Sequence, residues 1–252
     1  MERSVFDNMA QIDARHWWFA ARRQIIGALI RDRVQPPSGA RILEVGCGTG
    51  SNLELLGRFG AVDAIEPDPE ARAFAAGRSG VAVAGGTLPG GADLADGRYD
   101  LITLFDVLEH IPDDAGALEE LARKVAPGGS LLLTVPAMPW MWSGHDVAHH
   151  HHRRYTAASL RHTLEAAGFE LRFITHFNSL LFPLIAAARG LGKVTGREGG
   201  DDAIPAAPVN GALRAVFAAE RHLLPLMSLP FGVSLAVIAQ PKRAAAGERL
   251  AA

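Results

Sequence analysis

The chain has 252 residues, of which 48% are hydrophobic, and a formal net charge of −2. This is ample for a buried core, and the small charge gives no electrostatic reason to expect a nucleic-acid partner. Cys47 is the only cysteine, which excludes an intramolecular disulfide and a cysteine metal cluster. The N-terminus lacks the apolar core of a signal peptide, and no run reaches the ~18 apolar residues of a spanning helix. We therefore expect a cytoplasmic protein that does not cross a membrane.

Strand-like and helix-like stretches alternate along the chain, which predicts a parallel sheet covered by helices on both faces. The run HWWFAARRQIIGALI, before the first strand, has the spacing of an amphipathic helix. The expected strands are 41–45, 61–65, 81–84, 99–105, 130–135, 169–176 and 231–239. The expected helices are 52–59, 69–78, 113–125, 156–167 and 212–224.

A glycine loop follows the first expected strand at once, with Gly46, Gly48 and Gly50 coming after Glu44. Glycines at this spacing let the backbone turn sharply and approach a ligand closely. Glu66 ends the next strand, where a carboxylate can accept hydrogen bonds from both hydroxyls of a ribose. The loop and the acid together predict a nucleoside site. Glu44 would repel a pyrophosphate and suit a cationic nucleoside such as S-adenosylmethionine.

The motif EVGCGTG and the later acid resemble the class I S-adenosylmethionine-dependent methyltransferases, and LFDVLEHIPDD followed by LARKVAPGGSLLLTVP is a second point of similarity. The resemblance covers roughly residues 40–240. It implies a Rossmann-like seven-stranded α/β sheet with its last strand antiparallel, S-adenosylmethionine as cofactor and S-adenosylhomocysteine as product. Relatives commonly carry an adenine-binding acid where this chain has Gly85-Gly86-Thr87, so that contact passes to Thr87 and Leu88. The cofactor-binding residues expected are Glu44, Gly46, Cys47, Gly48, Gly50, Glu66, Pro67, Thr87, Leu88, Phe105 and Asp106.

The segment WMWSGHDVAHHHHRRY, residues 140–155, follows the strand that ends at Val135 and should lie at the carboxyl edge of the sheet, where ligands bind in such folds. We expect it to form the acceptor side of the pocket; the alternative is a solvated polar loop. His145 is the first choice for a general base because Asp146 could orient a neighbouring imidazole. The catalytic candidates are His145, His110 and Asp106. The substrate-binding candidates are Trp18, Arg22, Trp140, Trp142, His149, Arg154 and Tyr155.

Asp106, Glu109 and His110 also resemble the metal-binding element of ubiquinone-pathway O-methyltransferases and of small-RNA 2′-O-methyltransferases. That resemblance implies a magnesium-class ion that would lower the pKa of the acceptor hydroxyl. We expect no metal, and direct histidine base catalysis instead.

We divide a single domain, 1–252, into five parts. The long insertion could be a dimer contact, a lid, or a surface for a lipid-linked acceptor, with peripheral membrane contact through 179–194. The parts are an N-terminal helical cap (1–39), a cofactor-binding core (40–177), a helical insertion (178–230), a last strand (231–240) and a flexible tail (241–252).

The function expected is methyl transfer to an oxygen of a small molecule or of a lipid- or sugar-linked acceptor. Methylation of nitrogen or carbon, a non-catalytic cofactor-binding subunit of a larger complex, and a dehydrogenase are the alternatives. A homodimer is possible, and no nucleic acid is expected.

Overall fold

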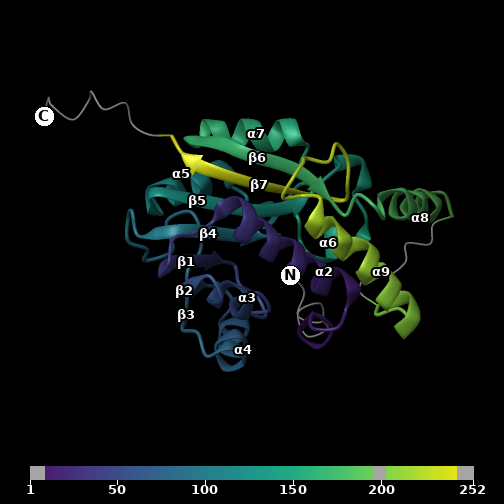
Figure 1. Ribbon diagram of the computed structural model, residues 1–252, viewed down its shortest axis with the longest axis horizontal. Helices are drawn as coiled ribbons and strands as arrows, with labels where there is room; N and C mark the ends of the chain where they lie inside the picture. Colours follow the sequence, from purple (N-terminus) through teal and green to yellow (C-terminus); the bar gives the residue numbers. More distant parts are fainter. Residues whose placement is uncertain (1–8, 196–202, 243–252) are drawn as a thin grey trace, which may run out of the picture.

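The computed structural model describes residues 9–195 and 203–242 and shows a seven-stranded sheet with helices on both faces (Figure 1). The strand order is β3-β2-β1-β4-β5-β7-β6. Neighbours from β3 to β5 pair in parallel, whereas β7 is antiparallel to both β5 and β6. The predicted fold class, with its antiparallel last strand, is confirmed. The strands are β1 (Ala40–Val45), β2 (Gly60–Ile65), β3 (Val83–Ala84), β4 (Tyr99–Phe105), β5 (Val125–Pro136), β6 (Phe169–Phe177) and β7 (Ser234–Pro241).

The helices begin where the sequence supplies caps. His16, Asp68, Asp113 and Thr156 each accept a hydrogen bond from a backbone N–H of the first turn that follows them. The described residues also form a π-helical segment (Ile30–Val34) and 3-10 turns at Leu108–His110, Pro139–Met141 and Glu220–His222. The α-helices are α2 (Trp17–Leu29), α3 (Leu53–Gly57), α4 (Pro69–Ser79), α5 (Asp114–Lys124), α6 (Gly144–Ala148), α7 (Ala157–Ala166), α8 (Phe182–Thr195) and α9 (Ala207–Ala219).

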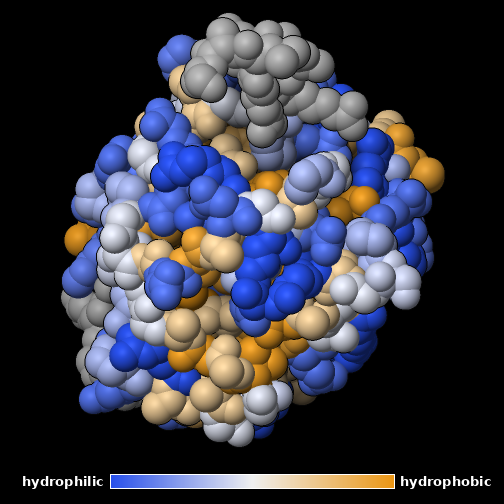
Figure 2. Space-filling model, turned by 90° about the vertical axis from the view of Figure 1, so that its left-hand side faces the viewer, coloured by the Kyte–Doolittle hydropathy of each residue, from blue (hydrophilic) through white to orange (hydrophobic). Residues whose placement is uncertain are grey.

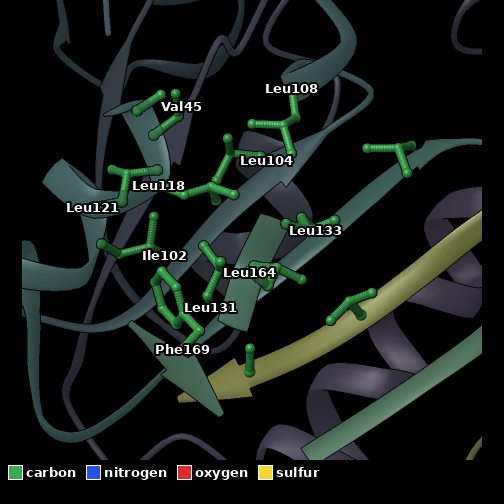
Figure 3. Packing of buried hydrophobic residues seen from close by; sticks show 14 of the residues in the cluster. Val45, Ile102, Leu104, Leu108, Leu118, Leu121, Leu131, Leu133, Leu164 and Phe169 are labelled. Atoms are coloured by element: carbon green, nitrogen blue, oxygen red, sulfur yellow. The ribbon is translucent and has the colours of Figure 1, made fainter. Parts of the chain in front are cut away.

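Two apolar clusters hold the sheet between its helices. On one face, side chains of α5 and α7 pack on β1, β4, β5 and β6, as Figure 3 shows for Leu118, Leu121 and Leu164. On the other face, α2 and α9 pack together over the sheet through residues such as Ile26 and Phe217. Both faces of the central strands are therefore buried, which explains why β4 and β5 read as continuous apolar runs rather than alternating ones.

Three predicted boundaries were wrong. The last strand was expected at 231–239, but β7 runs from Ser234 to Pro241. The fifth strand was expected to begin at Ser130, but it begins at Val125, which pairs with Tyr99 before the register shifts around the Pro-Gly-Gly turn. The second helix of the insertion was expected at 212–224, but α9 runs from Ala207 to Ala219. Its first turn contains Pro208, a residue favoured at a helix start, which lies before the predicted helix.

The insertion is attached to the sheet edge by one buried carboxylate. Glu220 accepts hydrogen bonds from the backbone N–H groups of Asn178, Ser179 and Leu180 at 2.6–2.8 Å. In Figure 1, α8 and α6 lie at the end of the molecule toward which β5 and β6 run. Figure 2 shows the opposite end, where hydrophilic and hydrophobic patches are mixed. None of the helices in the described part of the chain has the length and hydropathy to span a membrane.

Part of the predicted division falls outside these residues. The first eight residues of the cap, 196–202 of the insertion and 243–252 of the tail lie outside the described residues. The five-part division of the domain stays a prediction.

Candidate active site

The glycine loop turns at the carboxyl end of β1. Gly46, Gly48 and Gly50 have φ values of +66°, +51° and +73°, a region that favours glycine. A Cβ on Gly46 would meet Val107 at 2.8 Å, and a Cβ on Gly50 would meet Ala75 at 2.9 Å. A Cβ on Gly48 would meet nothing within 4 Å. Two of the glycines therefore allow close packing, and the middle one faces open space that a ligand can occupy.

The Glu66 carboxylate, at the end of β2, lies against this loop. Its Oε2 accepts a hydrogen bond from the Gly48 amide at 2.9 Å, and its Oε1 accepts one from the Asp68 amide at 3.1 Å. Only 8% of the residue is exposed. Each carboxylate oxygen has a further lone pair, so both can still accept a hydroxyl proton from a ligand. Glu66 thus fixes the loop and keeps acceptor capacity toward the same opening.

Glu44 is buried in β1, two residues before Gly46. Asn52 Nδ2 donates to its Oε1 at 3.0 Å, while Oε2 accepts no hydrogen bond among the described residues. Burial raises the pKa of Glu44 to about 7, against hydrogen bonding from Asn52 and the charge of Arg22, which lower it. A cationic ligand beside this carboxylate would favour its ionised form. The geometry therefore suits the cationic cofactor that the sequence predicts.

The cap segment is tied directly to the glycine loop. The buried Asp13 accepts hydrogen bonds through Oδ2 from Thr49 Oγ1 and from Arg78, both at 2.6 Å. Arg23 donates to the Asp13 carbonyl at 2.9 Å. One carboxylate thus links the cap, the loop and α4, and sequence analysis missed it because nothing near Asp13 in the chain signals a partner so distant.

The segment after β4 lies between the glycine loop and a second opening. Asp106 has φ +56° and forms a partly buried ion pair with Arg22 of α2. The Arg22 guanidinium lies 4.6 Å from the centre of the Trp18 ring, close enough for a cation-π contact. Because Val107, the next residue, contacts Gly46, this ion pair lies beside the glycine loop. The N-terminal helix, which belongs to the predicted cap, therefore reaches the site.

This second opening is a cavity of about 250 Å³ between the cap, the segment after β4, the histidine segment and the insertion. Aromatic and aliphatic side chains form much of its wall, and arginine and histidine side chains form the rest. Sequence analysis missed its contributions from the insertion because apolar positions there carry no motif. The lining residues are Met9, His16, Trp17, Trp18, Phe19, Arg22, Phe105, Asp106, Glu109, His110, Pro136, His145, His149, His151, Arg154, Asn178, Ile185, Arg189, Val233 and Ser234.

Four histidines gather at one side of this cavity. His145 and His149 come from α6 and the residue after it, with ring centres 4.0 Å apart. His110 meets His151 edge to face, with centres 4.7 Å apart. Burial lowers the pKa of His110 to about 3, so its imidazole is a weak base. The segment expected to be a loop is thus partly helical, with Ser143 and Asp146 forming a capping box at the start of α6.

Other predicted substrate residues have structural partners. The Arg154 side chain, 3% exposed, donates from Nε to Asp146 at 2.7 Å and from NH1 to the Ala137 carbonyl at 3.1 Å. Tyr155 lies outside the cavity lining and donates to Asp114 at 2.7 Å. Trp140 is 53% exposed and packs edge to face on Phe182; neither it nor Trp142 lines the cavity. Their roles in acceptor binding stay predictions.

The remaining cofactor candidates surround the loop more loosely. Cys47 is buried, and burial raises the pKa of its thiol, so it is not a reactive thiolate. Pro67 is exposed, and its carbonyl accepts from Arg72 at 2.9 Å. Thr87 is exposed, whereas Leu88 is half-buried against the core.

The metal alternative takes a different form from the one expected. Glu109, His110 and His151 have ligand atoms within 4.8 Å of one another, and neither Glu109 oxygen accepts a hydrogen bond within the described ranges. Asp106 is not part of this group, because it pairs with Arg22. Two imidazoles and one carboxylate are a poor donor set for a magnesium-class ion, which prefers oxygen ligands. The residues thus do not fit the ion that the resemblance implies, and we derive no step through it.

Fold and site together define a Rossmann-like domain with a glycine loop at the end of β1 and an aromatic cavity beside the end of β4. The chain belongs to the methyltransferase domain family, whose model matches residues 14–172. This confirms the family predicted from EVGCGTG and the acid at Glu66.

A curated relative is the ubiquinone biosynthesis O-methyltransferase of Xanthomonas axonopodis pv. citri (strain 306). It is 35% identical over 147 residues, which cover 52% of this chain and 60% of the relative. The match thus spans less than two thirds of the relative's length.

Solved structures share the fold at lower identity. A chain from the complex between the Haloferax volcanii Trm112 methyltransferase activator and a methyltransferase matches with a TM-score of 0.61 at 21% identity, covering 96% of this chain and 98% of that one. Haemonchus contortus phosphoethanolamine N-methyltransferase 2, in complex with S-adenosyl-L-methionine, matches with a TM-score of 0.57 at 14% identity, covering 87% of this chain and 52% of that one.

Proposed function

We propose that this chain is an S-adenosylmethionine-dependent methyltransferase that acts on an oxygen of a small molecule or of a lipid- or sugar-linked acceptor. One observation carries the proposal: the glycine loop lies against Val107 at Gly46, and the two residues before Val107, Phe105 and Asp106, line a cavity with aromatic walls and a histidine edge. Methyl transfer is an in-line displacement, so a methyl donor and an acceptor have to be held in neighbouring spaces.

In this proposal, Glu66 binds the ribose and the Gly48 region lies against the nucleoside. Glu44 favours the positive charge of the cofactor, because its carboxylate is buried near the loop. The cavity takes the acceptor. Trp17, Trp18 and Phe19 suit an apolar or flat acceptor body, and the polar side chains opposite suit a hydroxyl group.

Cofactor binding tests the first half of the proposal. Isothermal titration should show binding of S-adenosylhomocysteine and no binding of NAD, which separates a methyltransferase from a dehydrogenase. Gly48→Ala should weaken S-adenosylhomocysteine binding at least tenfold, because its Cβ would project into the ligand space. The matched control is Gly80→Ala, which has the same strain at φ +72° and also meets nothing within 4 Å, but ends α4 outside the site. Equal affinity in both variants would refute this placement of the cofactor.

Turnover tests the second half. Phenols, catechols, hydroxy acids, sugars, polyprenylated phenols and amines are each incubated with S-adenosylmethionine, and release of S-adenosylhomocysteine is measured. We expect an oxygen acceptor to react fastest. Faster reaction of an amine would favour the nitrogen alternative, and cofactor binding without any turnover would favour the non-catalytic subunit. The cytoplasmic location and the homodimer stay predictions.

A further inference from the structure

His151, at the edge of the cavity, is hydrogen-bonded to the carboxylate of Asp146, and other hydrogen bonds hold that carboxylate in place. His151 Nδ1 lies 2.9 Å from Asp146 Oδ1, and the His151 side chain is only 7% exposed. Asp146 is fully buried and also accepts hydrogen bonds from Arg154 Nε at 2.7 Å and from the Ser143 amide at 2.9 Å. The carboxylate cannot rotate without breaking these contacts, so it sets the orientation of the imidazole.

The charge on Asp146 decides which nitrogen of His151 carries the proton. Hydrogen bonds from His151 and Arg154 hold the pKa of Asp146 far below its usual value, against burial, which raises it. An ionised carboxylate can only accept, so Nδ1 is the donor and carries the hydrogen. In a neutral ring, Nε2 then has a free lone pair. Nε2 is directed toward the Glu109 side of the cavity, 4.0 Å from Glu109 Oε1.

Two of the other histidines, His110 and His145, are less well placed for proton transfer. His110 is half-buried, and burial lowers the pKa of its imidazole to about 3, so it is a poor base at neutral pH. The predicted base, His145, was chosen because Asp146 follows it in the chain, but the carboxylate turns to His151 instead. Asp146 lies in the first turn of α6, and His151 lies three residues beyond the end of that helix, so a helical turn separates Asp146 from His151 along the chain.

We propose that His151 Nε2 is the general base that accepts the proton of the acceptor hydroxyl, and that Asp146 is its positioning residue. This inference rests on the proposed function. In the step, the hydroxyl oxygen attacks the sulfonium methyl: an O–C bond forms, the S–C bond breaks, and its electron pair stays on sulfur, giving the neutral thioether. The hydroxyl proton passes to Nε2, and the resulting imidazolium, stabilised by Asp146, later releases it to water.

Several titratable and charged side chains face the His151 ring. Glu109 is held neutral by burial, which raises its pKa well above the usual value, so Asp146 is the main negative charge at the ring. Arg154 donates a hydrogen bond to the same carboxylate. The titratable and charged groups facing His151 are Asp146, Arg154, Glu109, His110 (4.7 Å between ring centres), His149 (5.9 Å) and His145 (6.2 Å).

Turnover of two variants tests the base with the fastest acceptor of the panel above. His151→Ala should lower kcat by about 100-fold or more, since general base catalysis is typically worth 10²–10⁴-fold. Its dissociation constant for S-adenosylhomocysteine should stay within threefold of the parent's. Added imidazole should restore part of the turnover. The control is His152→Ala, an exposed histidine of the same run that does not line the cavity. Equal kcat in the two variants would overturn the proposal.

Asp146→Asn tests the positioning role. It keeps the shape of the side chain, and thermal unfolding checks that it folds. It should lower kcat with little change in the acceptor KM, and it should move the proton of His151 from Nδ1 to Nε2, as read from nitrogen-15 NMR of the histidine rings. A lower kcat with an unchanged tautomer would mean a merely structural role.

Two further readouts separate this proposal from its neighbours. The tautomer of His151 in the parent protein can be measured by NMR without any turnover. If His151 is protonated on Nε2 or carries a charge at pH 8, the proposal that it is the general base is refuted, even if no acceptor is methylated. Turnover that disappears in EDTA and returns with a divalent cation would make His151 a metal ligand and also overturn the proposal. A parent that binds cofactor but methylates only amines refutes the proposed function instead.

Discussion

Glu66→Ala should lower both the affinity for the cofactor and the stability of the cofactor-free protein, because the same carboxylate binds the ribose and holds the glycine loop. In the structure, this carboxylate accepts two backbone N–H groups, from Gly48 at 2.9 Å and from Asp68 at 3.1 Å. Hydrogen bonds to a charged group contribute about 1.5–3 kcal/mol, and losing the ribose contacts together should weaken binding by that range. This corresponds to a dissociation constant for S-adenosylhomocysteine about 10- to 150-fold higher.

Two measurements separate the two roles of Glu66. Isothermal titration gives the affinity, and urea unfolding without ligand gives the free energy of unfolding, which we expect to fall by about 2 kcal/mol. Glu66→Gln should be intermediate in both, because it keeps one acceptor oxygen but loses the charge. The matched control is Glu54→Ala on α3, where an 85% exposed side chain pairs only with Arg58 in the described structure and neither quantity should change measurably. An affinity within threefold of the parent's in Glu66→Ala would show that the ribose binds elsewhere.

Three other expectations concern separate parts of the molecule. The pKa of Glu44 is raised from 4.5 to about 7 in the folded state, so folding takes up a proton at this carboxyl group. The free energy of unfolding of the cofactor-free protein should therefore fall by about 3 kcal/mol as the pH rises from 4.5 to 7. The free energy of unfolding of Glu44→Gln should fall less over that pH range, and an identical pH dependence would contradict the burial of this charge. Glu220→Ala should lower the free energy of unfolding by about 2–4 kcal/mol, since three backbone N–H groups lose their acceptor, and an unchanged midpoint in thermal unfolding would argue against its anchoring role. Turnover should persist in excess EDTA; loss of turnover that magnesium or manganese restores would establish a metal requirement.

The strands and the cofactor loop were predictable because their signals are local. Apolar runs such as YDLITLF are buried on both faces of the sheet, and the turn after β1 needs glycine at fixed positions, so each is written into a few consecutive residues. The start of β5 was not predictable, because the pairing of Val125 with Tyr99 depends on a bulge that places a turn-forming sequence inside a strand.

The catalytic edge was harder to predict because its contacts join residues from different elements. The sequence shows a run of histidines, but the choice among them depends on where a short helix directs Asp146, and that carboxylate meets His151 rather than the adjacent His145. The cavity wall from α8 and the contact between Asp13 and Thr49 have no local signature either. Such contacts form only when the fold brings distant segments together.

The Asp13 contacts bear on where this domain can be cut. The family match begins at residue 14 and stops at 172, within β6, whereas the carboxylate that joins Thr49 to Arg78 lies one position earlier, and β7, the neighbour of β5 in the sheet, lies far beyond the other limit. A fragment trimmed to the shared segment would expose the edge of β5 and leave Arg78 without its buried partner. The segment that matches the family is therefore smaller than the unit that can fold and hold its glycine loop in place. A truncated protein should keep both Asp13 and β7.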